Sequence, residues 1–284
     1  MRNHGHASNI FSYKKPSNIV IFILLIICAV IVIYPLFWMV MSSLKSYKEI
    51  YSNVWGLPAK PLFRNYVEAW KKGISRYFLN SVFVTFVTVI GVLLVASLCA
   101  FGLSRYRFKL GKFVLFICLG GLMLNPQICL IPLYILLKKT HIQNTYGAMI
   151  LPYIAFRLSF SVLLIRSYFL TIPREFEESA RIDGCNDMQI FEKVFLPVSK
   201  PILSTCAILT SNYAWNEFMF SVIFIDSERY RTIPSGLMTF RDALQTNWGV
   251  MLAGMVISSL PVIILFISMQ AQFIRGMTAG SVKG

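Results

Sequence analysis

Charged residues are scarce in this chain of 284 residues, and acidic residues are the scarcer kind. Only 14% of the residues are charged, with 27 lysines and arginines against 12 aspartates and glutamates. Soluble domains usually carry about 25% charged residues, so the composition argues against a water-soluble globular protein. A mean hydropathy of +0.65 and a hydrophobic content of 56% indicate a membrane protein instead.

The excess of basic residues gives a net charge of +15. In a soluble protein such an excess would suggest nucleic-acid binding. In a membrane protein, basic residues flank the spans and face anionic headgroups. We therefore expect a lipid bilayer, and no nucleic acid, among the partners of the chain.

The chain also lacks the patterns of several kinds of functional site. Its six cysteines include no CxxC pair and its three histidines are scattered, so neither a zinc site nor a disulfide framework is supported. The only Gly-Lys pair, Gly111-Lys112, is followed by Phe113, whereas a P-loop needs Ser or Thr there. No nucleophile–base arrangement stands out. We predict that the chain is not an enzyme and that it binds no metal or cofactor itself.

Long uncharged runs are what the sequence does contain. At about 1.5 Å per residue, each run can cross a hydrocarbon core of about 30 Å. They predict an all-α, polytopic membrane protein with six spans, at Ile19–Met41, Phe78–Leu103, Phe113–Leu137, Gly147–Tyr168, Ile202–Ile225 and Val250–Ile274.

Basic residues determine the orientation only weakly. With a cytoplasmic N-terminus, 14 basic residues lie inside and 12 outside. The tight cluster Arg105–Lys112 favours a cytoplasmic position for its short loop. Because the number of spans is even, we expect both termini inside a bacterial cell membrane. The predicted parts are a cytoplasmic segment (1–18), a first helix (19–41), an external loop (42–77), a five-helix core (78–274) with a cytoplasmic loop (171–201), and a cytoplasmic tail (275–284).

One polar stretch, Pro173–Pro201, separates the fourth and fifth spans. It contains six acidic and four basic residues, so it must lie outside the bilayer. Asp183-Gly184 is a turn signal. Three glutamates suit the positive end of a helix before that turn, at positions 175, 177 and 178. An apolar stripe at helical spacing follows the turn, at Ile190, Phe191, Val194 and Phe195. We predict a helix–turn–helix between Pro173 and Pro197.

The spacing in this stretch resembles the EAA signature of bacterial ABC-importer permeases. That signature reads Glu-Ala-Ala, three residues, Gly, nine residues, Ile, one residue, Leu-Pro. Here Glu178-Ser179-Ala180 is followed by Gly184, and Val194 precedes Leu196-Pro197 at the same distances. Serine replaces one alanine, and valine replaces isoleucine.

Other motifs are similar to the carbohydrate, or maltose-transporter-type, branch of these permeases. From about residue 17 the resemblance covers nearly the whole chain, and it indicates the shorter, six-helix subunit. The similar motifs are Asn80-Ser81, Asn125-Pro126-Gln127, Ile131-Pro132-Leu133-Tyr134, Trp215-Asn216-Glu217-Phe218, Thr232-Ile233-Pro234, Gly236-Leu237, Trp248-Gly249 and Gln270–Gly284.

The resemblance implies a type I permease fold and a transport function. A homologous second permease would share the pathway, an external binding protein would deliver a sugar or oligosaccharide, and two partner subunits would bind ATP and magnesium. The first short helix would be the coupling helix, seated in a cleft of the ATPase; the competing interpretation is an amphipathic loop lying on the bilayer. The implied coupling residues are Glu177, Glu178, Ser179, Ala180, Asp183, Gly184, Phe191, Leu196 and Pro197.

Two ionisable residues lie inside predicted spans, where charges are costly and usually face a bundle interior or water. Arg157 could pair with Glu217, snorkel, or contact an anionic sugar. Glu217 is accompanied by polar and aromatic residues that suit sugar hydroxyls and ring faces, although they suit helix packing equally well. The candidate pathway residues are Arg157, Asn212, Tyr213, Trp215, Asn216 and Glu217.

Two other functions stay open at this point. One is an importer of the same class for a non-sugar or anionic solute, such as glycerol phosphate or a peptide. The other is a stand-alone, ion-driven transporter, which would have no use for an EAA loop. The external loops Lys45–Arg76 and Ser227–Trp248 suit either a solute-binding protein or headgroup anchoring.

Overall fold

The structure is a computed structural model that describes residues 16–240 and 247–281, with side chains described at 19–240 and 247–268. All elements in these ranges are helical, which confirms the all-α class. The longer helices are α1 (Pro16–Ser43), α4 (Ser75–Arg105), α5 (Gly111–Met123), α6 (Leu130–Lys139), α7 (Gly147–Phe169), α11 (Lys200–Asn216) and α14 (Trp248–Ser281). The shorter ones are α2 (Tyr47–Ser52), α3 (Arg64–Ala69), η1 (Trp70–Ile74), α8 (Glu175–Ile182), α9 (Asp187–Ile190), η2 (Phe191–Phe195), α10 (Leu196–Val198), α12 (Met219–Phe224), α13 (Ile233–Gly236) and η3 (Leu237–Phe240).

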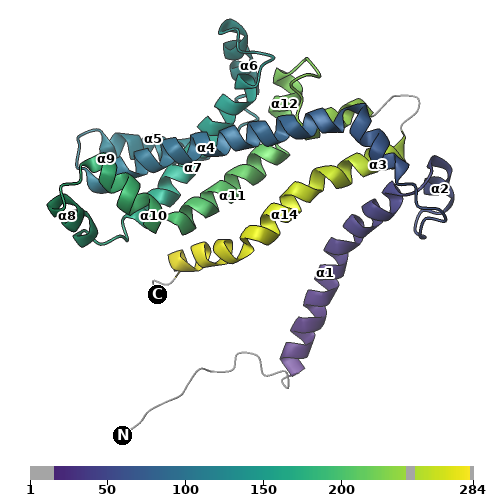
Figure 1. Cartoon of the computed structure of the whole chain (residues 1–284), viewed down its shortest axis with the longest axis horizontal. Helices are drawn as coiled ribbons and strands as arrows, with labels where there is room; N and C mark the ends of the chain where they lie inside the picture. Colours follow the sequence, from purple (N-terminus) through teal and green to yellow (C-terminus); the bar gives the residue numbers. More distant parts are fainter. Residues whose placement is uncertain (1–15, 241–246, 282–284) are drawn as a thin grey trace.

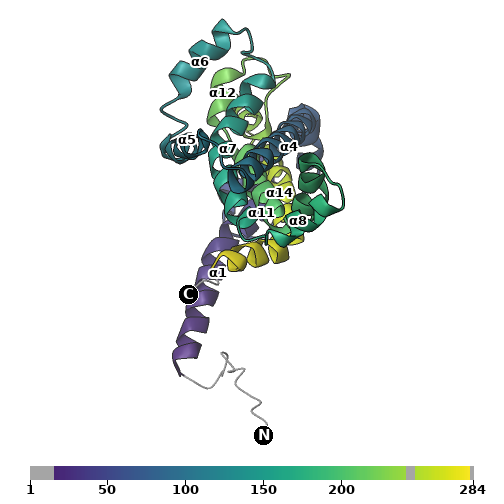
Figure 2. The same cartoon turned by 90° about the vertical axis from the view of Figure 1, so that its left-hand side faces the viewer.

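The body of the molecule is a bundle of α4, α7, α11 and α14, with α5 packed on α7 (Figures 1 and 2). Within a membrane, helices associate through close packing rather than through the hydrophobic effect, so small and β-branched residues are favoured at contacts. The buried face of α4 follows this rule with a residue at every fourth position, each fully buried: Val84, Thr88, Val92, Ala96 and Ala100.

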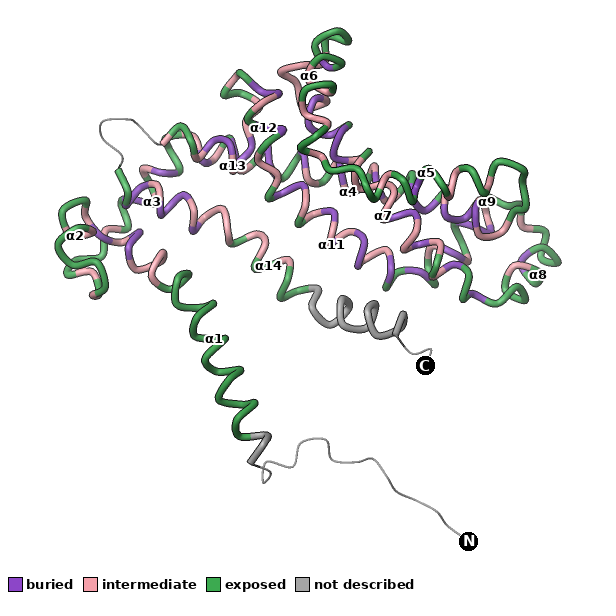
Figure 3. Tube along the Cα trace, turned by 180° about the vertical axis from the view of Figure 1, so that it is seen from behind, coloured by how far each residue is buried: buried purple, intermediate pink, exposed green. Residues whose placement is uncertain are grey.

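Helix α1 leaves this bundle at an angle and meets α14 only near its own C-terminal end (Figure 1). The most apolar window of α1 is 0% buried within the chain, and most of its described length is exposed in Figure 3. An apolar helix without cover in its own chain suits a lipid environment.

The prediction of an unbroken third span is wrong. Instead of one helix over Phe113–Leu137, α5 ends at Met123 and α6 begins at Leu130. Pro126 has no N–H to donate, and the side-chain oxygen of Asn125 accepts the N–H of Gln127 at 2.9 Å, which forms a turn in place of the helix.

The fifth predicted span is also interrupted. Rather than continuing over Ile202–Ile225, α11 ends at Asn216 and α12 begins at Met219. The carboxylate of Glu217 accepts the N–H of Phe220 at 3.0 and 3.1 Å, and so caps the first turn of α12.

These interruptions affect the number of possible spans. In the described part of the chain, four helical segments are long and apolar enough to cross a membrane: Ile19–Ser43, Arg64–Arg105, Gly147–Phe169 and Trp248–Ser268. A fifth would be the pair Asp187–Val198 and Lys200–Asn216, which is bent by 78°. The predicted number of six is not confirmed, because α5 has only 13 residues.

The predicted boundaries of the chain ends are tested only in part. The first helix begins at Pro16, three residues before the predicted start, and α14 continues to Ser281, past the predicted end at Ile274. Residues 1–15, 241–246 and 282–284 lie outside the described residues. Most of segment 1–18, part of the loop Ser227–Trp248 and the end of tail 275–284 are among them.

Candidate coupling surface and transport pathway

The polar stretch Pro173–Pro201 folds into two short helical segments at one end of the bundle, where α4 and α7 end and α11 begins (Figure 1). This confirms the predicted helix–turn–helix. The second segment does not stop at Pro197 but continues to Val198, after a π-type turn in which the N–H of Leu196 donates to the carbonyl of Phe191. The chain then bends sharply into α11.

The turn between the two segments depends on Gly184 and Asn186. Gly184 has φ of +80° and is exposed, a conformation that glycine adopts without the steric penalty of a side chain. Asn186 and Gln189 form a reciprocal capping box in which each side chain accepts the other's backbone N–H at 2.9 Å. The backbone of the turn therefore favours glycine at this position of the motif.

Arg105 holds the polar stretch against the bundle. Its Nη2 donates to the carbonyls of Phe169 at 2.9 Å and Ile172 at 2.7 Å. Its guanidinium lies 4.7 Å from the ring centroid of Phe195, and its side chain is only 6% exposed. Nε is 3.8 Å from a carboxylate oxygen of Glu177, which is close enough for attraction but too long for a hydrogen bond. One side chain thus joins the ends of α4 and α7 to α8 and η2.

The sequence did not reveal this role, since Arg105 is simply the first basic residue of the cluster after an apolar span. The contacts do place the basic loop and the polar stretch at the same end of the bundle.

The inner face of the polar stretch is apolar and buried. The Phe195 ring lies 4.8 Å and the Phe191 ring 5.3 Å from the ring of Phe101 on α4, measured between centroids. Ala180 is in the same cluster. Its small side chain therefore allows close approach of α8 to the chain's own bundle.

The outer face of α8 is exposed and mixed in character. Two large apolar side chains of α8 are exposed, Phe176 at 52% and Ile182 at 87%. Arg181 bonds to Glu177 at 3.0 Å and to Asp187 at 2.7 Å, so it braces the turn. The hydrogen bond to Glu177 is the main reason that the pKa of Arg181 is raised.

The predicted coupling residues therefore differ in burial. Ala180 and Phe191 are buried against the bundle, while Glu177 and Leu196 are half-buried. The exposed group comprises Glu178, Ser179, Asp183, Gly184 and Pro197.

At the opposite end, Asn80 and Ser81 hold a loop in place. Nδ2 of Asn80 donates to the carbonyls of Arg229 and Arg231, both at 2.8 Å. Its Oδ1 accepts the hydroxyl of Tyr146 at 2.7 Å, and Oγ of Ser81 accepts the N–H of Ile233 at 2.9 Å. These two motif residues thus position the segment that leads into α13.

The candidate pathway residues do not form a single site. Tyr153 donates to Glu217 at 2.6 Å, and Glu217 also caps α12. Arg157 does not pair with Glu217 in the described part of the chain. Its guanidinium instead lies 5.1 Å from the ring centroid of Phe160 and 5.4 Å from that of Tyr213.

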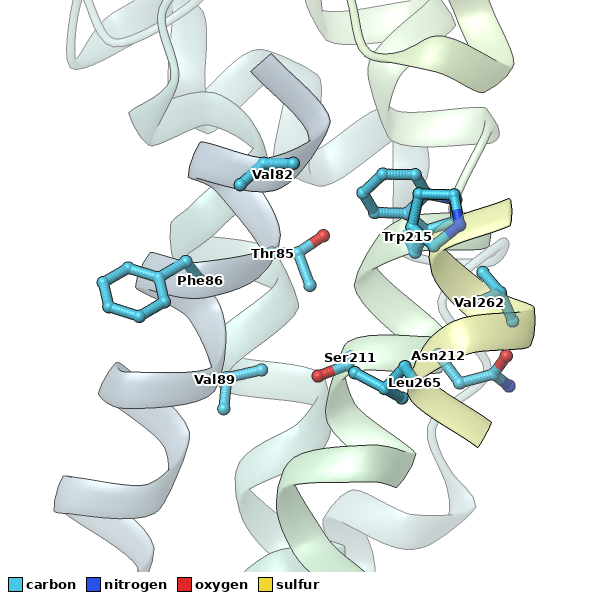
Figure 4. Close-up of a pocket in the computed structure, with 10 residues that line it drawn as sticks. Val82, Thr85, Phe86, Val89, Ser211, Asn212, Trp215, Val262 and Leu265 are labelled. Carbon is cyan, nitrogen blue, oxygen red and sulfur yellow. The ribbon is translucent and has the colours of Figure 1, made fainter. Parts of the chain in front are cut away.

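The other candidates lie on a different side of α11. A groove of about 240 Å³ runs between α4, α11 and α14 (Figure 4). Asn212 and Trp215 line it from α11, opposite Thr85 and Phe86 of α4. Trp215 is largely buried, and its indole N–H donates to the carbonyl of Ser258 at 3.1 Å, so its main role is in packing. Asn216 bonds back to Asn212 and lines a neighbouring cavity with Trp215.

Residues 92–279 match the family described as "Binding-protein-dependent transport system inner membrane component". The chain belongs to this family. It is thus a membrane permease component rather than an enzyme, and a stand-alone ion-driven transporter is ruled out. No group of three or more residues able to hold a metal ion occurs in the described part of the chain.

Curated relatives match this permease over almost its whole length. It is 52% identical to the "Probable ABC transporter permease protein YurM" of Bacillus subtilis, over 96% of this chain and 90% of the relative. It is 32% identical to the trehalose/maltose transport system permease protein MalG of Thermococcus litoralis, over 91% of this chain and 94% of the relative.

Among solved structures, a chain of a bacterial ABC transporter involved in the import of the acidic polysaccharide alginate has a similar fold. The TM-score is 0.83 at 25% sequence identity, over 93% of this chain and 98% of that one. The predicted importer-permease fold is therefore confirmed.

Proposed function

We propose that this permease takes up a sugar or oligosaccharide that an external solute-binding protein delivers. Relatives at about a third identity support a carbohydrate cargo, since their names specify diacetylchitobiose, arabinooligosaccharides and trehalose/maltose. A homologous second permease would complete the pathway. Two partner subunits would bind ATP and magnesium, and this chain would bind neither.

The observation that carries the coupling role is the exposed apolar surface of α8. Phe176 and Ile182 are exposed on a short helix that packs on the bundle through Ala180, with Glu177 3.8 Å from Arg105. Exposed apolar side chains ringed by acidic residues suit a protein cleft. Closure of the ATPase pair would move this helix and switch the pathway between inward-facing and outward-facing states. This end, with both chain termini, would then be cytoplasmic.

Co-purification tests this role. In the full complex, Phe176→Asp should strongly reduce the amount of ATPase that purifies with the permease pair, because it places a charge in an apolar cleft. Met188→Asp is the matched control, since Met188 is equally exposed at 52% but lies on α9. If Phe176→Asp retains the ATPase as fully as the control does, α8 is not the docking element.

An acidic saccharide is the second candidate cargo. Arg157 is a cation in a span with no acidic partner in the described part of the chain, and one structural neighbour takes part in alginate import. In this case Arg157→Gln should abolish stimulation of the complex's ATPase by a uronate oligosaccharide with its binding protein. For a neutral cargo, the same variant should leave stimulation by the neutral sugar nearly unchanged.

A further inference from the structure

The segment between α1 and α3 folds into a hairpin that turns back along α1. We call residues 44–62, which include α2, the α2 hairpin. The N–H of Leu62 donates to the carbonyl of Leu44 at 2.8 Å and closes the base. At the tip, the indole N–H of Trp38 on α1 donates to the carbonyl of Val54 at 3.0 Å. The ring of Trp55 stacks on Tyr34 of α1, with centroids 6.1 Å apart.

The position of Tyr34 along α1 sets the depth of this tip. The hydrocarbon core cannot begin before Pro16, because Lys14 and Lys15 precede it. Tyr34 lies 18 residues after Pro16, which corresponds to about 27 Å of helix, less than the core thickness of about 30 Å. A tilt of α1 would place Tyr34 deeper still. The tip therefore lies at the boundary of the hydrocarbon.

Several backbone groups of the tip are paired within the chain, which lowers the cost of an apolar environment. Lys45 is 1% exposed, and its ammonium donates to the carbonyls of Asn53 at 2.7 Å and Val54 at 3.2 Å. The side chain of Asn53 accepts the N–H of Gly56 at 2.9 Å and donates to the carbonyl of Leu57 at 3.3 Å. A loop facing only water would have no need of a buried lysine for this purpose.

The outer surface of the hairpin is aromatic and basic. Trp55 is 74% exposed and Leu57 67% exposed, while Tyr51 and two lysines, Lys48 and Lys60, are also exposed. Tryptophan and tyrosine are enriched where headgroups meet acyl chains, and lysines there contact lipid phosphates.

We propose that the α2 hairpin is an interfacial anchor whose tip, residues 54–57, inserts at the boundary between headgroups and acyl chains. The partner of this surface is the lipid bilayer and not the solute-binding protein. The anchor fixes the depth of α1, whose contacts with α14 among the described residues lie near the C-terminal end of α1 (Figure 1). The proposal rests on the membrane location of the permease and is independent of its cargo.

Fluorescence quenching by brominated lipids tests the proposal. The complete transporter is reconstituted into bilayers that carry bromine either high on the acyl chains or near their ends. The emission of Trp55 is obtained as the difference between the native complex and the Trp55→Phe variant. We expect a loss of this emission that is larger for bromine near the headgroups, and no change on addition of the solute-binding protein.

Trp215→Phe provides the matched control, because Trp215 is buried in the bundle and its difference emission should lose little intensity with either lipid. The proposal is overturned if the Trp55 emission is insensitive to both brominated lipids. It is equally overturned if Trp55 is quenched by iodide in the water phase and becomes protected when the binding protein is added.

Discussion

Replacement of Arg105 by methionine should release the polar stretch from the bundle while leaving the bundle itself folded. Methionine keeps most of the side-chain volume at the position, so the loss is confined to the guanidinium. The affected contacts are those with the Phe169 and Ile172 carbonyls and with the Phe195 ring.

The size of the effect follows from these contacts. The hydrogen bond to Ile172, immediately before the stretch, comes from a charged donor at a nearly buried site and contributes about 1.5 kcal/mol. The bond to Phe169 lies within the bundle and is not counted. The stacking on Phe195 adds up to about 1 kcal/mol. We count nothing for Glu177, because its oxygen is 3.8 Å from Nε. A loss of about 2 kcal/mol corresponds to a change of about 30-fold in the equilibrium between the seated and released stretch.

Hydrogen exchange of the complex in bilayers measures this equilibrium directly. Amides of residues 175–198 should lose about 30-fold in protection in Arg105→Met, with an intermediate loss in Arg105→Lys, which keeps the charge but not the planar fork. Arg107→Met is the matched control, because Arg107 belongs to the same basic loop but is exposed. If Arg105→Met and Arg107→Met show equal protection over this stretch, the assigned role of Arg105 is refuted.

Two further substitutions test local geometry. Gly184→Val should lower ATP-driven uptake because a β-branched residue at positive φ is strained by about 1–2 kcal/mol, whereas Gly184→Asn should retain most uptake; equal uptake by the two variants would contradict the turn argument. Glu217→Ala should lower the thermal unfolding midpoint of the permease, since it removes the cap of α12 and the acceptor of Tyr153 at a cost of about 1–3 kcal/mol. Glu217→Gln should recover part of the loss, and an unchanged midpoint in Glu217→Ala would show that neither bond stabilises the fold.

The polar stretch could be predicted from the sequence because its signals are local. A Gly at a turn, acids at a helix start and an apolar stripe each act within a few residues of one another. Residues that act across the fold were harder to predict. Arg105 bonds to residues 64 and 67 positions away, and no sequence pattern near Arg105 predicts these bonds.

The two interrupted spans show a related limit of prediction from hydropathy. Hydropathy measures how well a segment suits lipid, and both Phe113–Leu137 and Ile202–Ile225 score as apolar. It does not register that the side chains of Asn125 and Glu217 compete for backbone N–H groups and so end a helix. Glu217, which we predict to line a pathway, bonds to Tyr153 and Phe220.

Helix α4 joins the two ends of the molecule in a way that gives it the properties of a lever. Arg105, the last residue of α4, contacts the polar stretch and bonds to the residue before it. Asn80 and Ser81, near the first turns of α4, bond to the loop before α13. Its 31 residues form a rod of about 46 Å. A tilt of about 5° about one end of such a rod displaces the other end by about 4 Å. A small rotation of α4 at the polar stretch therefore moves the distant loop by more than the length of a hydrogen bond.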